Sequence, residues 1–502
     1  MALIDWIIVL LYATSTILVG WFFGRKQENT KEYFIGSGKM NPYLIGVSLF
    51  ATLLSTISYL AIPGEVLGKG PAYMAIFLSY PFVFLVLAFV ILPVYMKTRV
   101  TSAYELLEQR LGLSVRMLGA IMFLALRLIW MSLLVYLTAK AIAIMIGAGD
   151  GSIIWIVILT AIFAIIYTSV GGLRAVVITD LMQSLLLYGG ALIVIGTVTL
   201  KLGGLAWFPT EWQSDVWDKQ KLISFDPSTR VTVAGSMLWI FLFLVCTSMG
   251  DQVSVQRFMS TKDVRAARKA IAMQLTTAFV VGSTLCVVGL ALLGFFQANP
   301  GLLPADESIK SQADQLFPHF IAAQLPPVVT GLVVAGLFAA AMSSIDSGVN
   351  SITAVVMTDF LDRFGRKPQS GKQQLGVARS LAIGIGVIVV SISTLMKYVP
   401  GNFLAVTNKT TNLFTGPIAL LFIFALFVPF ANARGVWIAT LASVATAAIA
   451  AFSGVIFGPD PVTGMDPISF QLILPSCLAV GLLVGLVACK FFSWRDKSRR
   501  FH

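Results

Sequence analysis

Long apolar runs follow one another along almost the whole chain, with short polar breaks between them. Runs of about 20 residues or more suit helices that cross the hydrocarbon core of a bilayer. The pattern therefore predicts an all-α polytopic membrane protein with about 13 transmembrane helices. The spans are expected near residues 3–24, 41–68, 72–96, 115–146, 151–170, 176–203, 231–249, 270–297, 326–360, 375–398, 403–430, 434–456 and 467–489.

Composition supports this prediction. The 502 residues are 57% hydrophobic and 12% charged, whereas soluble domains are about 25% charged. The first run has no basic region before it and is long enough to span, so we retain it as a helix and not as a cleaved signal. The four cysteines fall in predicted spans without C-x-x-C spacing, which favours small core residues over disulfides or metal ligands. With only two histidines, a histidine-based metal centre is not expected.

The net charge of +12 is spread over many short loops. With the N-terminus outside, the inward segments hold 25 of the 35 lysines and arginines. The positive-inside rule therefore predicts an outside N-terminus and a cytoplasmic C-terminus in the plasma (inner) membrane. The same dispersal argues against a nucleic-acid partner, because no continuous basic patch forms.

Residues 331–363 concentrate polar oxygen atoms inside an otherwise apolar span. On a helix, Ser343, Asp346 and Ser347 share one face, with Ser344 and Ser351 close by. A carboxylate with several hydroxyls suits a small hard cation, and a buried carboxylate needs such a partner. The alternative is that the serines only allow close helix packing.

A second carboxylate, Asp180, falls about one turn inside the span 176–203. We expect no basic residue at the same inner depth, so Asp180 and Asp346 would need a cation or a proton between them. The alternative places Asp180 near the interface, paired with Arg174 or solvated.

Span 41–68 carries five Ser and Thr residues before the pair Pro63-Gly64. This pattern predicts a helix interrupted at Pro63-Gly64, whose freed carbonyls could coordinate a cation. A Ser/Thr-rich packing face with a bend at Pro63 is the alternative.

Arg127 lies near mid-membrane in span 115–146, with Trp130 on the same face. Arg127 could contact an anionic solute, orient Trp130, or bond carbonyls of a neighbouring helix. No Walker A sequence and no catalytic signature occur, so neither an ATP-driven pump nor an enzyme is indicated.

Four motifs in order resemble the sodium:solute symporter family, and the resemblance covers nearly the whole chain. They are TSAYELLEQRL (101–111), YTSVGGLRAVVITDLMQ (167–183), QRFMSTKD (256–263) and GLFAAAMSSIDSGVNS (336–351). The resemblance implies the inverted five-helix-repeat fold within one transmembrane domain, with a broken helix opening each repeat. Its expected parts are a peripheral first helix (3–24), a first repeat (41–203), a second repeat (231–430), two peripheral helices (434–489) and a cytoplasmic tail (490–502).

The resemblance also implies sites. The common sodium site of the family matches Ala51, Leu54, Ala340, Ser343 and Ser344 here. A second cation site, found in bacterial sialic acid transporters, matches Asp180, Ser343, Asp346 and Ser347, although those transporters have serine where this chain has Asp346. One or two sodium ions are therefore expected.

The solute site is expected to involve Ser55, Ser58, Tyr73, Phe77, Arg127 and Trp130. The arginine that holds the carboxylate in sialic acid transporters is replaced here by Trp130. An acidic sugar, a small monocarboxylate and a neutral sugar remain open as solutes. We predict a monomeric sodium-coupled symporter that imports a small organic solute by alternating access. A proton-coupled symporter is one alternative; a solute sensor is the other, which the short stretch after the last span disfavours.

Overall fold

The computed structural model describes residues 2–24, 38–98, 100, 102–303, 308–365, 370–398, 403–459 and 466–498, with the backbone alone at 150, 163–172, 371–372, 403–404 and 495–498. Residues 25–37, between the first two expected spans, and residues 499–502 of the expected tail lie outside these residues. Within the described ranges the chain is helical, apart from turns and one isolated β-bridge between Lys221 and Thr232.

The helices long enough to shape the molecule are, in chain order, α1 (Leu3–Gly24), α3 (Pro42–Leu53), α4 (Thr56–Lys69), α5 (Tyr80–Val86), α6 (Leu92–Thr98), α7 (Glu105–Leu111), α8 (Leu113–Ile146), α9 (Ile153–Lys201), α10 (Val233–Gly250), α11 (Gln252–Met259), α12 (Val264–Ala298), α13 (Ala313–Gln324), α14 (Val329–Val355), α15 (Gly371–Ser393), α16 (Phe403–Phe427), α17 (Ala433–Ala451), α18 (Ser453–Phe457) and α19 (Ile473–Ser498). Short 3₁₀ and π segments join or extend them, including η1 (Pro71–Ser79), η2 (Leu87–Ile91) and η6 (Val356–Asp362).

Eleven helical segments of the described residues are long and apolar enough to cross a membrane, or twelve when the bent pair α3 and α4 counts as one span. The all-α polytopic prediction is therefore confirmed, and the count of thirteen is approximate. The expected spans 151–170 and 176–203 both fall on α9, where Ile153–Ile162 is a short apolar helix and Leu173–Lys201 is a candidate span.

Local sequence explains where several helices begin. Asn41 accepts a hydrogen bond from the Tyr43 N–H and precedes a proline, so it caps α3. Thr232 caps α10 and Asp263 caps α12 in the same way, each accepting from the N–H three residues on. These caps satisfy backbone donors that would otherwise lack partners at a helix start.

Two transmembrane helices are interrupted. α3 and α4 meet at 67° across Leu54 and Ser55, which are both extended, so the predicted break at Pro63-Gly64 is wrong. Pro63 instead lies inside α4. The true break has no Gly or Pro; it is marked only by Ser55, whose hydroxyl caps α4 by accepting from the Ser58 N–H at 3.4 Å.

The second interruption joins α10 to α11 through one residue, Asp251. Its carboxylate accepts from the Val253 N–H at 2.9 Å and so caps α11. Tyr95 and Tyr104 donate their hydroxyls to the carbonyls of Met249 and Gly250, at the open end of α10. Residues 250–269 lie between two expected spans, 231–249 and 270–297, but α11 within them is a fully buried helix.

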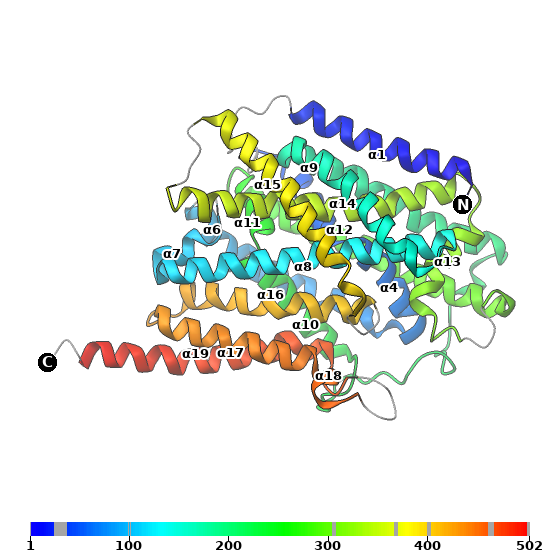
Figure 1. Ribbon diagram of the computed structural model, residues 1–502. Helices are drawn as coiled ribbons and strands as arrows, with labels where there is room; N and C mark the ends of the chain where they lie inside the picture. The colour runs from blue at the N-terminus through cyan, green and yellow to red at the C-terminus, as the bar shows by residue number, and fades with distance from the viewer. Residues whose placement is uncertain are drawn as a thin grey trace.

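α14 lies in the middle of the bundle and packs on α9, α8, α3 and α1, whereas α17 and α19 lie together along one edge (Figure 1). α1 runs along the opposite edge. Its Asp5 is buried, and its carboxylate accepts from the N–H groups of Val328 (2.9 Å) and Gly331 (3.0 Å) at the start of α14. One carboxylate therefore attaches the first helix to the central one.

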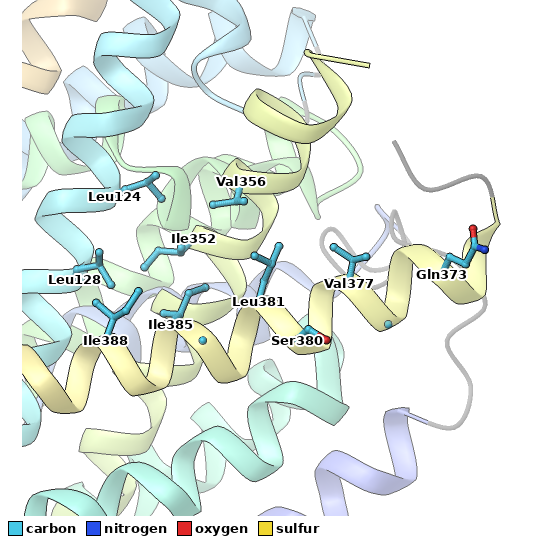
Figure 2. A pocket seen from close by; sticks show the side chains of 12 residues that line it. Leu124, Leu128, Ile352, Val356, Gln373, Val377, Ser380, Leu381, Ile385 and Ile388 are labelled. Carbon is cyan, nitrogen blue, oxygen red and sulfur yellow. The ribbon is translucent and has the colours of Figure 1, made fainter. Parts of the chain in front are cut away.

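A cavity of about 850 Å³ opens between α8, α14 and α15, and Figure 2 shows its lining. Leu124 and Leu128 of α8 face Ile352 of α14 and Leu381 and Ile385 of α15 across it. Its walls are almost wholly apolar and include none of the residues expected to bind sodium or solute. The expected sodium and solute residues therefore have to be sought elsewhere in the fold.

All four cysteines are free and buried, as expected for small core residues.

Candidate functional site

The middle of α14 faces the break between α3 and α4. The Ser344 hydroxyl donates to the Thr52 carbonyl in the last turn of α3, at 3.3 Å. A helix leaves its last carbonyls without N–H partners, so this turn exposes oxygen atoms inside the protein. Ala51 belongs to the same turn and Leu54 follows it as the extended residue at the break, while Ala340 and Ser343 lie near Ser344 on α14. The five residues of the expected sodium site are thus on facing elements and are buried.

Two further contacts hold α14 to the broken helix. The Thr56 hydroxyl donates to the Leu337 carbonyl at 2.9 Å. The hydroxyls of Thr52 and Ser347 lie 3.0 Å apart. Hydroxyl and carbonyl oxygens therefore dominate the interface, and such hard neutral donors suit Na⁺. The residues present fit a sodium ion between Ser344 and the end of α3.

Asp180 of α9 adds a carboxylate to this oxygen cluster. Ser343 donates its hydroxyl to one oxygen of Asp180, and Ser48 of α3 donates to the other at 2.5 Å. Asp180 is fully buried and accepts hydrogen bonds from α3 and α14, so the alternative of a solvated carboxylate is wrong.

The expectation that no basic residue lies at this depth is also wrong. Arg257 of α11 points its guanidinium into the cluster and is 1% exposed. Its nitrogens donate to the hydroxyls of Ser48 (2.9 Å), Thr52 (2.7 Å) and Ser347 (2.6 Å), and lie 3.4 Å from an Asp180 oxygen.

Arg257 therefore occupies part of the position expected for a second cation. Asp346 on α14 also interacts electrostatically with Arg257. The structure brings Asp180, Ser343 and Ser347 together, but the positive charge among them comes from the chain itself. In the sequence, Arg257 lies in the motif QRFMSTKD, between the expected spans 231–249 and 270–297, so it was not assigned to the membrane interior. The imbalance of two intramembrane carboxylates was the signal that a cation had to approach them.

A chamber of about 140 Å³ lies beside the same break, between α3, α4, η1, α8, α10, α12 and α16. Of the residues expected to bind solute, four line it: Ser58, Tyr73, Phe77 and Trp130. Ser55 does not line it and serves as the cap of α4. The sequence analysis missed Trp239 and Phe243 of α10, which form an aromatic wall, and Gln274 of α12.

Arg127 lies in a smaller adjoining chamber of about 40 Å³, which shares Leu53, Trp130, Phe243 and Thr411 with the larger one. Its guanidinium forms a two-pronged ion pair with Asp251, from Nη2 to Oδ2 and from Nε to Oδ1 at 3.3 Å. Both side chains are only 5% exposed. Arg127 thus pairs with a carboxylate at the break of α10 and α11, an arrangement that was not among the alternatives considered from the sequence.

The profile of the family described as "Sodium:solute symporter family" matches residues 33–442. The chain belongs to the sodium:solute symporter family. It is 30% identical to the "Sodium/sialic acid symporter NanT" of Aliivibrio fischeri, over 88% of this chain and 86% of that protein. It is 29% identical to the rabbit (Oryctolagus cuniculus) "Sodium-dependent multivitamin transporter", over 97% of this chain and 76% of that protein.

The fold also matches a solved structure of a Na⁺-coupled sialic acid symporter in a substrate-bound outward-open state. The TM-score is 0.84 at 25% identity, covering 98% of both chains. This symporter family has the inverted-repeat transporter fold, so the fold class and the family expected from the motifs are confirmed. The protein is a multi-pass membrane transporter with sodium and a small-molecule solute as partners, and not an enzyme.

Proposed function

We propose that this symporter imports a small organic solute together with one sodium ion by alternating access. The observation that carries the proposal is the contact between Ser344 of α14 and the last turn of α3. A sodium ion bound there would hold a central helix against a broken one, and so would order the neighbouring solute chamber.

The proposed sodium ligands are the carbonyl oxygens of Ala51, Leu54 and Ala340 and the hydroxyls of Ser343 and Ser344. The burial of all five residues supports them, because a cation bound away from water gains most from fixed oxygen ligands. Ser343 also donates its hydroxyl to Asp180, which orients the hydroxyl oxygen and leaves a lone pair for the ion.

The Arg257 guanidinium supports one sodium ion and not two. It satisfies the hydroxyls of Ser48, Thr52 and Ser347 and neutralises Asp180, so a second metal cation would add positive charge to a cluster that already has one. Like charges in a low-dielectric site repel strongly.

The proposed solute site is the aromatic chamber beside the break, with Ser58, Tyr73, Phe77 and Trp130 in its walls. Ser55 would contribute indirectly, because its hydroxyl caps α4 and so fixes where that helix begins. The relatives named above carry sialic acid or vitamins; an acidic sugar, a monocarboxylate and a sugar are the corresponding candidates for this chain.

We further propose that the N-terminus lies outside and the C-terminus in the cytoplasm of the plasma membrane, and that the protein is a monomer. In this orientation most of the lysines and arginines outside the spans lie on the cytoplasmic side. The two repeats would cover residues 41–203 and 231–430, each beginning with one of the two broken helices.

A thermal-shift comparison of the purified protein in NaCl and in KCl tests the sodium site. A bound ion raises stability by about 2.7 kcal/mol when it is present at 100 times its Kd. We expect sodium to raise the Tm of the unmodified protein and Ser344→Ala to lower the sodium affinity at least about tenfold, because a ligand oxygen is removed.

Ser391→Ala is a matched control, since Ser391 is an exposed helical serine that donates to a carbonyl of its own helix. Its sodium response should equal that of the unmodified protein. A Ser344→Ala protein with a normal sodium response would refute the site. In a separate transport assay, solute uptake driven by an imposed pH gradient without sodium would favour proton coupling.

A further inference from the structure

We propose that the Arg127–Asp251 pair excludes carboxylates from the solute site, so that the transporter selects an uncharged six-membered-ring solute bearing hydrogen-bond acceptors. This inference rests on the solute chamber of the proposed function. It departs from the relatives named above, because it assigns an uncharged solute to a pocket of the same fold.

The first observation is the absence of charge from the chamber wall. Among the described residues that line it, none is Asp, Glu, Lys, Arg or His. Aromatic and aliphatic side chains predominate, including Phe77, Trp130, Trp239 and Phe243. An ionised carboxylate moved from water into such surroundings loses its hydration without gaining a charged partner, which is strongly unfavourable.

The volume indicates the size of the solute. The chamber of about 140 Å³ is close to the engineered cavity of about 150 Å³ that binds benzene in another protein. A single six-membered ring therefore fills it. Aromatic side chains pack with rings in offset-stacked or edge-to-face arrangements, so the walls suit a ring-shaped solute.

Two polar groups in the wall still need partners. The indole N–H groups of Trp130 and Trp239 are buried and have no acceptor within the part of the chain that the structure describes. An unsatisfied buried donor costs about 1–3 kcal/mol, and a solute oxygen that accepts from it removes that cost. These neutral donors suit a carbonyl or hydroxyl oxygen.

The nearby positive charge is already neutralised. Arg127 is held by both oxygens of Asp251, and both side chains are almost completely buried. Asp251 also accepts from the Val253 N–H at the start of α11, so it is fixed on two sides. A solute carboxylate would have to displace this prealigned carboxylate and leave Asp251 buried without its partner.

The backbone N–H groups at the starts of α4 and α11, near the two chambers, also have partners within the chain. Helix N-termini attract carboxylates in transporters with broken helices. Ser55 caps α4, however, and Asp251 caps α11. Asp251, in the adjoining smaller chamber, therefore already occupies the guanidinium and the helix start that a solute carboxylate would use.

The test uses matched pairs of probes with the full-length protein in NaCl: nicotinamide with nicotinate, and glucose with glucuronate. We expect the uncharged member of at least one pair to raise the Tm and its carboxylate partner to have no effect. Trp130→Phe and Trp239→Phe should each weaken binding of the uncharged member about five- to tenfold, because one donor is lost. A carboxylate that binds the unmodified protein more tightly than its uncharged partner overturns the proposal.

The decisive variant is Asp251→Ala, which frees Arg127. It should acquire affinity for nicotinate or glucuronate at least about tenfold above that of the unmodified protein, since a charged hydrogen bond becomes available. Should this variant not fold, Asp251→Asn keeps the cap and carries the same expectation. The double variant Arg127→Met with Asp251→Asn has neither charge of the pair and should not acquire affinity for nicotinate or glucuronate.

Asp263→Ala is the matched control, because Asp263 caps another helix, α12, and is exposed. It should not change solute preference. Absence of any carboxylate gain in the folded Asp251 variants overturns the proposal. The Tm difference between NaCl and KCl is also measured for each variant without solute. A lost difference would show that the proposed sodium site is wrong, independently of the solute test.

Discussion

At the scale of single residues, Arg257 has the most unusual surroundings in the described part of the chain. A guanidinium inside a membrane protein normally needs both hydrogen-bond acceptors and a countercharge. Three hydroxyls and Asp180 supply them, on α3, α14 and α9. The side chain thus connects the first broken helix to the central helix in the way that a bound cation would.

Replacing Arg257 by Met tests this interpretation. Breaking a buried ion pair by removing one partner costs about 3–5 kcal/mol, so the variant should be markedly less stable in KCl. Sodium should restore part of that stability, because Asp180 and the hydroxyls around it become available to a second ion. The Hill coefficient for sodium, measured by thermal shift, should rise from about one toward two.

Arg257→Lys keeps a positive charge and serves as the control, with an expected coefficient near one. A coefficient of two in the unmodified protein, or an Arg257→Met protein that responds to sodium as the unmodified one does, would contradict the assignment of a single ion.

The sequence indicated most of the oxygen atoms of this cluster but not its cation. Ser343, Ser344 and Asp180 were expected near one another because the resemblance to the sodium:solute symporter family matches them to two cation sites that share Ser343. Arg257 was not expected there, since its polar neighbours resemble a loop, and only tertiary packing buries α11. The Arg127–Asp251 pair was missed because its partners are 124 residues apart in the chain and only tertiary packing brings them together.

At the scale of elements, the two broken helices differ in how they are broken. The α3–α4 break is extended over two residues and capped by Ser55, whereas the α10–α11 break uses Asp251 alone. The sequence predicted a break in the first of these helices because of its hydroxyls, but placed it at Pro63-Gly64. Proline disrupts a helix by removing one N–H, and α4 tolerates that loss eight residues beyond Ser55, where neighbouring helices support it.

The close approach of α12 to α4 at Pro63 can be tested at Gly289. A Cβ at Gly289 would lie 2.5 Å from the Pro63 carbonyl oxygen and 3.1 Å from the Val66 Cβ, both on α4. Because the backbone cannot yield easily, Gly289→Ala should lower stability by about 1–3 kcal/mol, measured as a lower Tm in NaCl. Gly196→Ala is the matched control, because a Cβ there meets nothing within 4 Å. Equal Tm values for the two variants would show that α12 and α4 separate readily.

At the scale of the whole molecule, a group of ion pairs joins α7, α8 and the end of α14. Arg116 at the start of α8 contacts Asp359 at 2.7 Å and Glu108 at 2.5 Å. Arg363 contacts Glu108 at 2.8 Å from beyond η6. Asp359 also accepts from the Ser102 hydroxyl at 2.6 Å. These contacts lie far along α14 from the solute chamber and fix one end of the bundle.

Acid should weaken this group of ion pairs through Glu108. The guanidinium groups of Arg363 and then Arg116 lower the pKa of Glu108 below its usual value. A carboxyl with a lowered pKa in the folded state stabilises the protein above its unfolded pKa of about 4.3 and loses that contribution as the pH falls through the folded value. Glu108→Gln should therefore cost about 0.5–1 kcal/mol at pH 7.

The difference in Tm between Glu108→Gln and the unmodified protein should shrink as the pH is lowered from 7 toward 3.5. Glu211→Gln, in the exposed segment between α9 and α10, should match the unmodified protein throughout. A Glu108→Gln difference that is independent of pH would mean that packing, and not charge, accounts for the cost.

The attachment of α1 through Asp5 has a consequence for biosynthesis. Asp5 and its partner Val328 are 323 residues apart in the chain. At roughly 5–20 residues per second, a ribosome needs on the order of 15 to 65 seconds to make the intervening segment. During that interval the first helix has entered the membrane while the backbone donors that its carboxylate binds at the start of α14 do not yet exist. One oxygen of Asp5 already accepts from the Ala2 N–H at 2.7 Å, but the other must wait for its backbone partners until the ninth expected span emerges. The first helix can therefore pack on α9 early in synthesis and is attached to α14 only later.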